Sequence, residues 1–145
     1  MRCCAGIVLF NPEIERLKEN ISKIINQVDK VLLVDNGSKN IREIENLIRN
    51  QDRLELIKYT SNRGIAFALN EIKRFAELNN YKWFLTLDQD SVSEDNLVKQ
   101  YEEFINKHEV SKVGCITWNI IDRNFSTSNK IVDFQYINYC ITSGS

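Results

Sequence analysis

The chain has 145 residues, of which 43% are hydrophobic and 27% charged, a profile typical of one globular domain rather than a disordered or fibrous segment. Its 19 basic and 20 acidic residues leave a formal net charge of −1, so no overall field draws it onto nucleic acid or an anionic membrane. The apolar run CCAGIVLF at 3–10 is far shorter than a spanning helix, and we expect a cytoplasmic protein without a nucleic-acid partner.

Four strand–helix units follow one another along the chain. The apolar run at 3–10 is continuous, as in a strand buried on both faces of a parallel sheet. A second buried strand is predicted at 31–34, and further strands at 54–59 and 83–87. Apolar residues at three- and four-residue steps predict helices at about 12–27 with Asn11 as the cap, at 41–48 and at 65–78. A fourth helix is expected after Ser93, its N-cap, with an inner face running from Leu97 to Ile105. Two further strands are predicted at 113–121 and 131–141.

This alternation predicts an α/β fold with three layers, in which helices cover both faces of a mainly parallel, Rossmann-like sheet. We expect a single domain over residues 1–145. The cysteines lack CxxC spacing and His108 is the only histidine, which argues against a zinc site. We therefore predict buried, reduced thiols on strands at Cys3, Cys4, Cys115 and Cys140.

Ligands of open α/β sheets bind beyond the carboxyl ends of the strands. That rule selects the stretches at 10–11, 35–38, 61–64 and 88–90. Asp88 and Asp90 are two residues apart, so on a continuing strand their carboxylates project from the same side, with alpha carbons about 7 Å apart. A divalent cation relieves their repulsion, and Mg²⁺ is usually held by one or two carboxylates with substrate phosphates and water. The alternative interpretation is a pair of solvated turn residues.

Three other residues at these strand ends are candidates for binding. Asp35 is either the acid of an Asx-turn or a carboxylate that accepts hydrogen bonds from a ribose or a base N–H. Phe10 could stack on a flat base, although an aromatic beside a buried strand also suits a core. Arg63, between Asn62 and Gly64 at a helix start, is either a surface arginine or a partner for a base or phosphate.

The order of these stretches resembles the nucleotide-sugar-binding half of glycosyltransferase family 2, whose enzymes have the GT-A fold, and within it the rhamnosyltransferase-like branch. The motifs that carry the resemblance are IVLFNP at 7–12, VDNGS at 34–38, NRGIAFALN at 62–70, LDQDS at 87–91 and ITSGS at 141–145. Leu9 and Phe10 depart from the hydroxyl residue and the tyrosine that many members carry. Base stacking survives a change from tyrosine to phenylalanine, but a phenol hydrogen bond does not.

The resemblance implies a metal-dependent, inverting transfer of a sugar, such as rhamnose, from a dTDP- or UDP-type donor to a glycan or lipid-linked acceptor, in polysaccharide or O-antigen synthesis. In that site Phe10 and Asp35 contact the base, Arg63 lies near it with Asn62 and Gly64, and Asp88 reaches the ribose. Asp88 and Asp90 would bind Mg²⁺ or Mn²⁺ on the diphosphate. A pathway of this kind also implies a peripheral position at the inner face of the membrane.

Family members carry their catalytic base downstream of the SGS strand. The resemblance therefore implies that the base lies beyond Ser145. We expect the chain to be the donor-binding part of a longer transferase. The rival interpretation is an incomplete half-protein that binds a nucleotide-diphosphate sugar but is inactive or needs a partner chain. An apolar surface near 131–141 would favour a homodimer or such a partner.

Two other protein classes, a phosphatase and a signalling module, fit the sequence less well. An apolar strand followed by Asp-x-Asp also begins haloacid-dehalogenase phosphatases, but no later strand after Asp90 closes on paired acids. A receiver-like signalling module needs an acidic pocket with a lysine after its last strand. Here Asp35 and Asp88 follow different strands and that lysine is missing.

Overall fold

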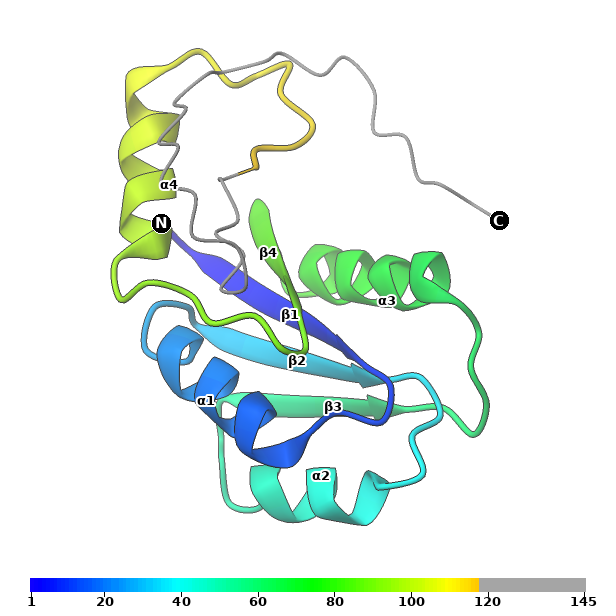
Figure 1. Ribbon diagram of the computed structural model, residues 1–145. Coiled ribbons are helices and arrows are strands. Elements are labelled where there is room, and N and C mark those ends of the chain that lie inside the picture. Colours follow the sequence, from blue (N-terminus) through cyan, green and yellow to red (C-terminus); the bar gives the residue numbers. More distant parts are fainter. Residues whose placement is uncertain (118–145) are drawn as a thin grey trace, which may run out of the picture. The chain divides into compact units, whose positions relative to one another are not determined.

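Four parallel strands form one sheet in the order β3-β2-β1-β4 (Figure 1). Their bounds are Cys3–Leu9 for β1, Lys30–Asp35 for β2, Leu54–Lys58 for β3 and Trp83–Asp88 for β4. The computed structural model describes residues 1–117. Of these, residues 1–104 form one unit, and residues 105–117 belong to a second unit.

Helices cover both faces of this sheet, which confirms the predicted three-layer α/β fold (Figure 1). Helices α1 (Ile14–Ile24) and α2 (Ile41–Ile48) lie against one face, and α3 (Ile65–Leu78) lies against the other. A fourth helix, α4, spans Leu97–Lys107. The helices predicted at 41–48 and 65–78 are confirmed as α2 and α3, and the first four predicted strands agree with β1 to β4 to within one residue at either end.

Strand β1 lies between β2 and β4 and is buried on both faces. Ala5, Ile7 and Leu9 pack into the core beneath α1 and α2, whereas Gly6 faces Ile72 of α3. Alternate residues of a strand project from opposite faces. Because helices cover both faces of β1, every position of this strand has to be apolar or small. The central strand thus fixes the spacing of both helical layers.

The predicted buried thiols are confirmed for Cys3 and Cys4, which are free and lie in β1. Burial raises the pKa of the Cys3 thiol to about 11 and that of the Cys4 thiol to about 12, because a thiolate loses its hydration there. The prediction is wrong for Cys115, which is free but exposed. It lies in an irregular segment, since residues 113–117 form no strand. Cys140, the rest of the predicted strand at 113–121 and the one at 131–141 lie outside the described residues.

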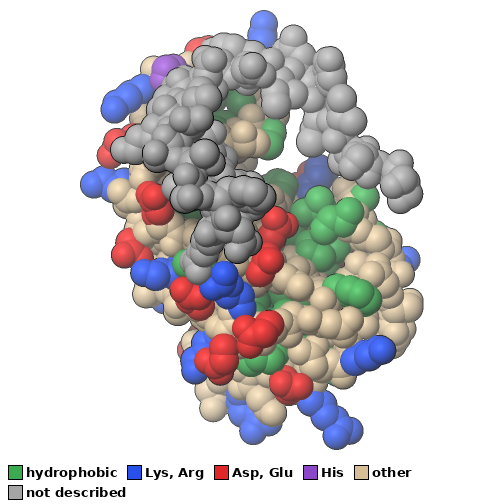
Figure 2. Space-filling model, in the orientation of Figure 1, with side chains coloured by type: hydrophobic (Ala, Val, Ile, Leu, Met, Phe, Trp, Pro, Cys, Tyr) green, Lys and Arg blue, Asp and Glu red, His purple; other side chains and the backbone are tan. Residues whose placement is uncertain are grey.

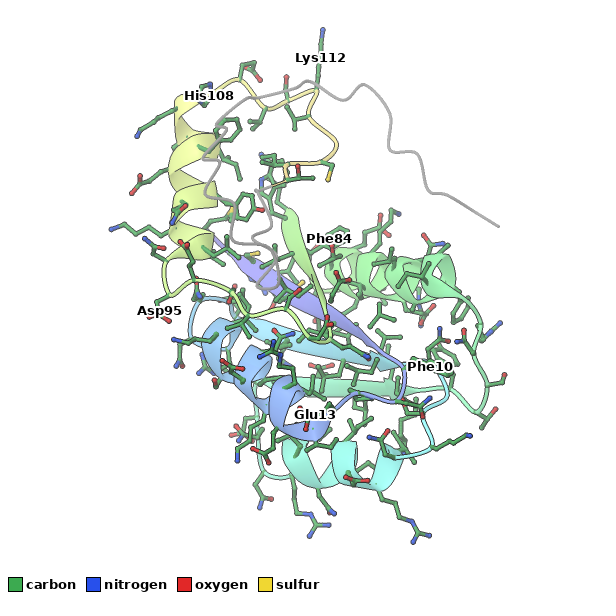
Figure 3. The ribbon with its side chains drawn as sticks, viewed as in Figure 1. Phe10, Glu13, Phe84, Asp95, His108 and Lys112 are labelled. Atoms are coloured by element: carbon green, nitrogen blue, oxygen red, sulfur yellow. The ribbon has the colours of Figure 1, made fainter. Side chains whose placement is uncertain are left out.

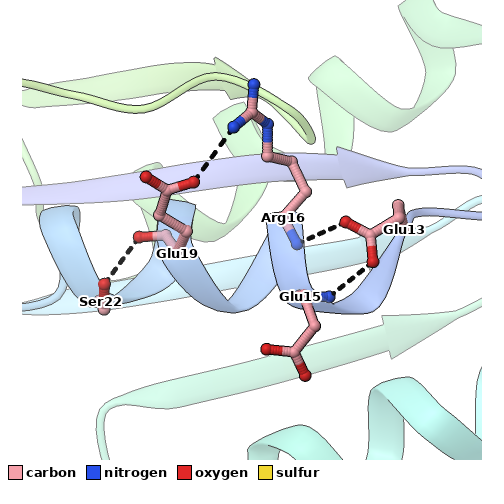
Figure 4. Close-up of polar contacts among 5 residues, drawn as sticks. All are labelled: Glu13, Glu15, Arg16, Glu19 and Ser22. Atoms are coloured by element: carbon pink, nitrogen blue, oxygen red, sulfur yellow. Dashed lines mark hydrogen bonds and ion pairs between the residues drawn. The ribbon is translucent and has the colours of Figure 1, made fainter.

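Helix α1 begins later than predicted and has a different cap (Figure 4). The carboxylate of Glu13 accepts from the main-chain nitrogens of Glu15 at 3.0 Å and Arg16 at 2.8 Å. Asn11 cannot cap the helix because its backbone is left-handed, with φ at 49°, and its side chain accepts from the Lys39 nitrogen instead. Glu13 therefore caps α1 in place of Asn11, whose side chain joins two loops instead.

The start of α4 also differs from the prediction. Ser93 was expected as the N-cap, but the helix begins at Leu97, and the buried Ser93 hydroxyl has no hydrogen-bond partner within the described part of the chain. The Val98 nitrogen in the first turn donates to Oε1 of Gln27 at 3.2 Å. A side chain that follows α1 thus satisfies a free N–H of the first turn.

The described surface is of mixed charge. On the face shown in Figure 2, Lys and Arg side chains are spread among Asp and Glu side chains, so the described residues visible there form no continuous basic patch of the kind that binds nucleic-acid phosphates. Each helix within residues 1–117 is too short or too polar to traverse a bilayer.

The close contact between Gly6 and α3 yields a test of the packing. A β carbon at Gly6 would lie 2.4 Å from Cγ2 of Ile72, so Gly6→Ala should lower the free energy of unfolding by about 1–3 kcal/mol through overpacking. Adding Ile72→Ala removes the overlapping atoms, and the double variant should lose less than the sum of the two single losses in urea denaturation. Gly114→Ala is the control, because among described residues nothing lies within 4 Å of its β carbon. Simple additivity would contradict the described packing.

Candidate functional site

The carboxyl ends of the strands meet at one edge of the sheet. The parallel register pairs Leu9 with Asp35, Val8 with Asp88 and Asp35 with Lys58, so the four strands end within about one residue of each other. Phe10, Asp35 and Asp88 therefore come to the same edge, as predicted from strand order. The loop that carries Asn62, Arg63 and Gly64 follows β3 at this edge.

Phe10 follows β1 and is 46% exposed, so it lies outside the core (Figure 3). Its main-chain nitrogen donates to Oε1 of Gln89 at 2.8 Å, and Nε2 of Gln89 donates back to the Phe10 oxygen at 3.4 Å. This paired amide contact joins the end of β1 to the turn after β4. It leaves the ring of Phe10 accessible for stacking.

Asp88 and Asp90 are both exposed, whereas Gln89 between them is half-buried. The Ser91 nitrogen donates to the Asp88 main-chain oxygen at 3.2 Å and closes a turn. Within residues 1–117, neither carboxylate forms an ion pair. Because Gln89 turns toward Phe10, its two neighbours present their carboxylates to solvent.

The carboxylates of Asp88 and Asp90 fit a metal site shared with a substrate rather than one formed by protein side chains alone. Among the described residues, no three His, Cys, Asp or Glu side chains lie close enough to form a metal cage. Two exposed carboxylates instead suit Mg²⁺ or Mn²⁺ shared with substrate phosphates and water, since such ions commonly take only one or two protein carboxylates. The donor set of Asp88 and Asp90 is therefore suited to a metal bound together with a diphosphate.

Asp35 is buried, with 1% of its surface exposed. Its carboxylate accepts from the Gly37 nitrogen at 3.3 Å and from the Ser38 nitrogen at 3.2 and 3.3 Å. These are contacts of the Asx-turn type, so one role of Asp35 is to shape the loop after β2. Contact with a nucleotide base stays a prediction.

Asn36, which the sequence indicated only as part of a motif, joins the loops after β2 and β3. Its Nδ2 donates to Oδ1 of Asn62 at 3.0 Å and to the Gly64 oxygen at 3.3 Å, while its Oδ1 accepts from the Arg63 nitrogen at 2.8 Å. The Gly64 nitrogen in turn donates to Oδ1 of Asn62 at 2.8 Å. Three predicted binding residues are thus held by one buried amide.

Asn11 and Ser38 form a similar link between the loops after β1 and β2. The Asn11 nitrogen donates to Oγ of Ser38 at 2.8 Å, and the Lys39 nitrogen donates to Oδ1 of Asn11 at 2.8 Å. The stretches selected from the sequence contain these two residues as well as Gln89 and Asn36, but no part in joining the loops was predicted for any of them. Their shared feature is a short polar side chain directly after an apolar strand, next to a predicted binding residue.

Arg63 rests on aromatic rings rather than on an acidic partner. Its guanidinium carbon lies 3.8 Å from the ring centre of Phe67 and 5.3 Å from that of Tyr59. These two rings meet edge to face, with centres 5.0 Å apart. Burial, together with a hydrogen bond to Glu71, raises the pKa of Tyr59, so its phenol stays neutral to a higher pH than an ordinary tyrosine does. Cation–π contact therefore orients Arg63 at the strand-end edge.

An all-parallel, Rossmann-like sheet with helices on both faces is the arrangement of the GT-A fold, the class of nucleotide-sugar-dependent transferases. The sequence profile of glycosyl transferase family 2 matches residues 4–142, which include all the strand ends described above. The chain belongs to glycosyl transferase family 2. The family implies a nucleotide-sugar donor and an acceptor. No curated protein matches the chain.

Two glycines of these loops provide a matched comparison. Gly37 and Gly64 have φ values of 89° and 85°, so alanine at either position should cost about 1–3 kcal/mol in backbone strain. A β carbon at Gly37 would also lie 2.8 Å from the main-chain carbon of Ser61, whereas at Gly64 none of the described atoms lies within 4 Å. Gly37→Ala should therefore lower the urea midpoint more than Gly64→Ala. Equal midpoints would contradict the close approach of the two loops.

Proposed function

We propose that this chain is the donor-binding part of a metal-dependent, inverting glycosyltransferase that uses a dTDP- or UDP-type sugar, rhamnose being the first sugar to test. The observation that carries the proposal is the joining of Phe10 to the Asp88–Asp90 turn through Gln89. A stacking ring and two exposed carboxylates are held together at the ligand-binding edge of the sheet. Nucleotide-sugar donors combine a flat base with an anionic diphosphate. The ring suits the base, and the two carboxylates suit a metal ion bound to the diphosphate.

The base side of the proposed donor site is formed by the loops after β1, β2 and β3. Phe10 supplies an exposed ring on which a base stacks. Asp35 accepts from a base N–H while it keeps its loop contacts, because a carboxylate has about four acceptor positions. Arg63 lies near the base, with Asn62 and Gly64 shaping the loop beside it.

The diphosphate side is formed by the turn after β4. Asp88 reaches the ribose and shares Mg²⁺ or Mn²⁺ with Asp90. When bound, the metal ion stabilises the negative charge that develops on the departing nucleoside diphosphate. Neither carboxylate forms an ion pair within residues 1–117, and this supports the assignment because no described basic side chain competes with a cation there.

The acceptor proposed is a glycan or a lipid-linked precursor of a polysaccharide or O-antigen. A lipid-linked acceptor would bring the reaction to the inner face of a membrane, and the proposed protein partner is a second copy of this chain or a separate chain. Family membership supports the presence of an acceptor. The kind of acceptor, the membrane position and the partner are part of our proposal.

Replacement of Asp90 tests the metal site directly. In calorimetry with UDP or dTDP, Asp90→Ala should lower the affinity measured in Mn²⁺ to the metal-free value, because the remaining carboxylate holds the cation poorly. Asp52→Ala removes an exposed carboxylate just before β3, at the opposite edge of the sheet, and should keep the wild-type affinity.

Unchanged affinity in Asp90→Ala would refute its metal role, and wild-type protein with no metal-dependent affinity for either nucleotide would refute the proposed function. Donor hydrolysis by the wild-type chain in Mn²⁺ then separates an active transferase from a protein that only binds the donor.

Replacement of Phe10 tests the base side separately. Phe10→Ala should weaken the binding of nucleoside monophosphate and diphosphate by the same factor, corresponding to about 1–3 kcal/mol, because one base–aromatic stack is lost. The effect should not depend on metal. Phe84→Ala is the control, since Phe84 is 39% exposed but lies at the other end of its strand (Figure 3). A loss confined to Mn²⁺-containing buffer would show that Phe10 does not bind the base.

A further inference from the structure

Asn20 occupies an unusual place for a polar residue. It lies on the core side of α1 between Leu17 and Ile24, and 0% of its surface is exposed. Burying an amide among apolar groups is unfavourable unless its polar atoms are hydrogen-bonded. An apolar residue would satisfy the packing of this helix, so the asparagine has another role.

The side chain of Asn20 reaches the carboxyl end of β4. Its Nδ2 donates to the main-chain oxygen of Asp88 at 2.7 Å, while its Oδ1 has no hydrogen-bond partner within residues 1–117. The same Asp88 oxygen accepts from the Ser91 nitrogen. Asn20 therefore binds the backbone at the point where β4 turns toward Asp90.

Other side chains in and after α1 hold the segment that follows this turn. Lys23 pairs with Asp95 at 2.9 Å, and Nε2 of Gln27 donates to the Glu94 oxygen at 2.7 Å. Lys23 follows Asn20 by three residues on α1, the spacing of neighbours on a helix surface, whereas Gln27 lies just beyond the end of the helix. The segment after β4 is thus bound to the α1 side at several points, with Asn20 nearest the two carboxylates.

We infer that Asn20 is a positioning residue for the donor diphosphate and its metal ion. By fixing the main-chain carbonyl of Asp88, it sets the direction in which the carboxylates of Asp88 and Asp90 leave the backbone. Gln89 fixes the same turn from the side of β1. The inference rests on the proposed function, because the direction of these carboxylates matters only if they bind a ligand.

Substitution by leucine separates positioning from stability. Leucine has the branching and about the size of asparagine, and Asn20→Leu removes the donor and the unpaired oxygen together. The free energy of unfolding should therefore change little. Affinity for UDP or dTDP in Mn²⁺ should fall by roughly 10- to 100-fold, as when other groups that orient metal ligands are removed. Affinity without metal should stay at the wild-type value.

Asn26→Leu is the matched control. Asn26 is exposed just beyond the end of α1, where its side chain accepts from Arg53. Wild-type affinity in Mn²⁺ for Asn20→Leu, beside a loss in Asp90→Ala, would overturn the inference and leave the proposed function standing. Equal losses with and without metal would also overturn it, because a purely structural role predicts them. No metal-dependent binding by the wild-type protein would overturn both proposals.

A measurement on the wild-type protein covers the case in which Asn20→Leu does not fold. In NMR spectra, the side-chain amide protons of Asn20 should exchange slowly with solvent. Their resonances should shift together with the Asp90 main-chain amide when UDP or dTDP is added with Mg²⁺, while the side-chain amide of Asn26 should not shift. An unshifted Asn20 amide beside a shifted Asp90 amide would contradict the positioning role.

Discussion

The parallel pairing of β1 with both of its neighbours is the interaction on which the strand-end edge depends. Its register brings Leu9 beside Asp35 and Val8 beside Asp88, so three strands finish almost level. Short side chains are then long enough to join one loop to the next. Gln89 reaches Phe10 although 79 residues separate them in the chain. A shift of one residue in either ladder would reverse the faces of a strand and separate these partners.

The loops at this edge are joined mainly by neutral amides. Asn36 and Gln89 each donate to one loop backbone group and accept from another. Asn11 and Asn62 accept from loop backbone nitrogens through their side-chain oxygens. The charged side chains of these loops mostly lie at the surface, where Asp88, Asp90 and Arg63 are exposed. Asp35 is the exception, since its buried carboxylate holds its own turn. A framework of neutral groups adds no charge that would repel an anionic ligand.

Strands β1 to β4 and helices α2 and α3 were predictable because strand-length apolar segments and helical spacing are local properties of the sequence. The starts of α1 and α4 were not. Asn11 binds the loop after β2, so Glu13 caps α1 in its place. In the first turn of α4 the Val98 nitrogen donates to Gln27, which lies beyond the end of α1. In both cases a contact distant in the sequence changed the start expected from the local pattern. The strand-end rule selected Phe10, Asp35, Asp88 and Asp90. It could not select Asn20, whose position reads as part of an apolar helix face.

The adjacent thiols of β1 allow the opening of this strand to be followed by cysteine alkylation. Cys3 and Cys4 are buried, and their raised pKa values keep them as unreactive thiols, whereas Cys115 is exposed to reagent in the folded chain. Alkylation of the β1 pair therefore requires the strand to leave the sheet. Its rate measures how often the ladder that aligns the strand ends comes apart, and a donor that binds across those ends would slow it.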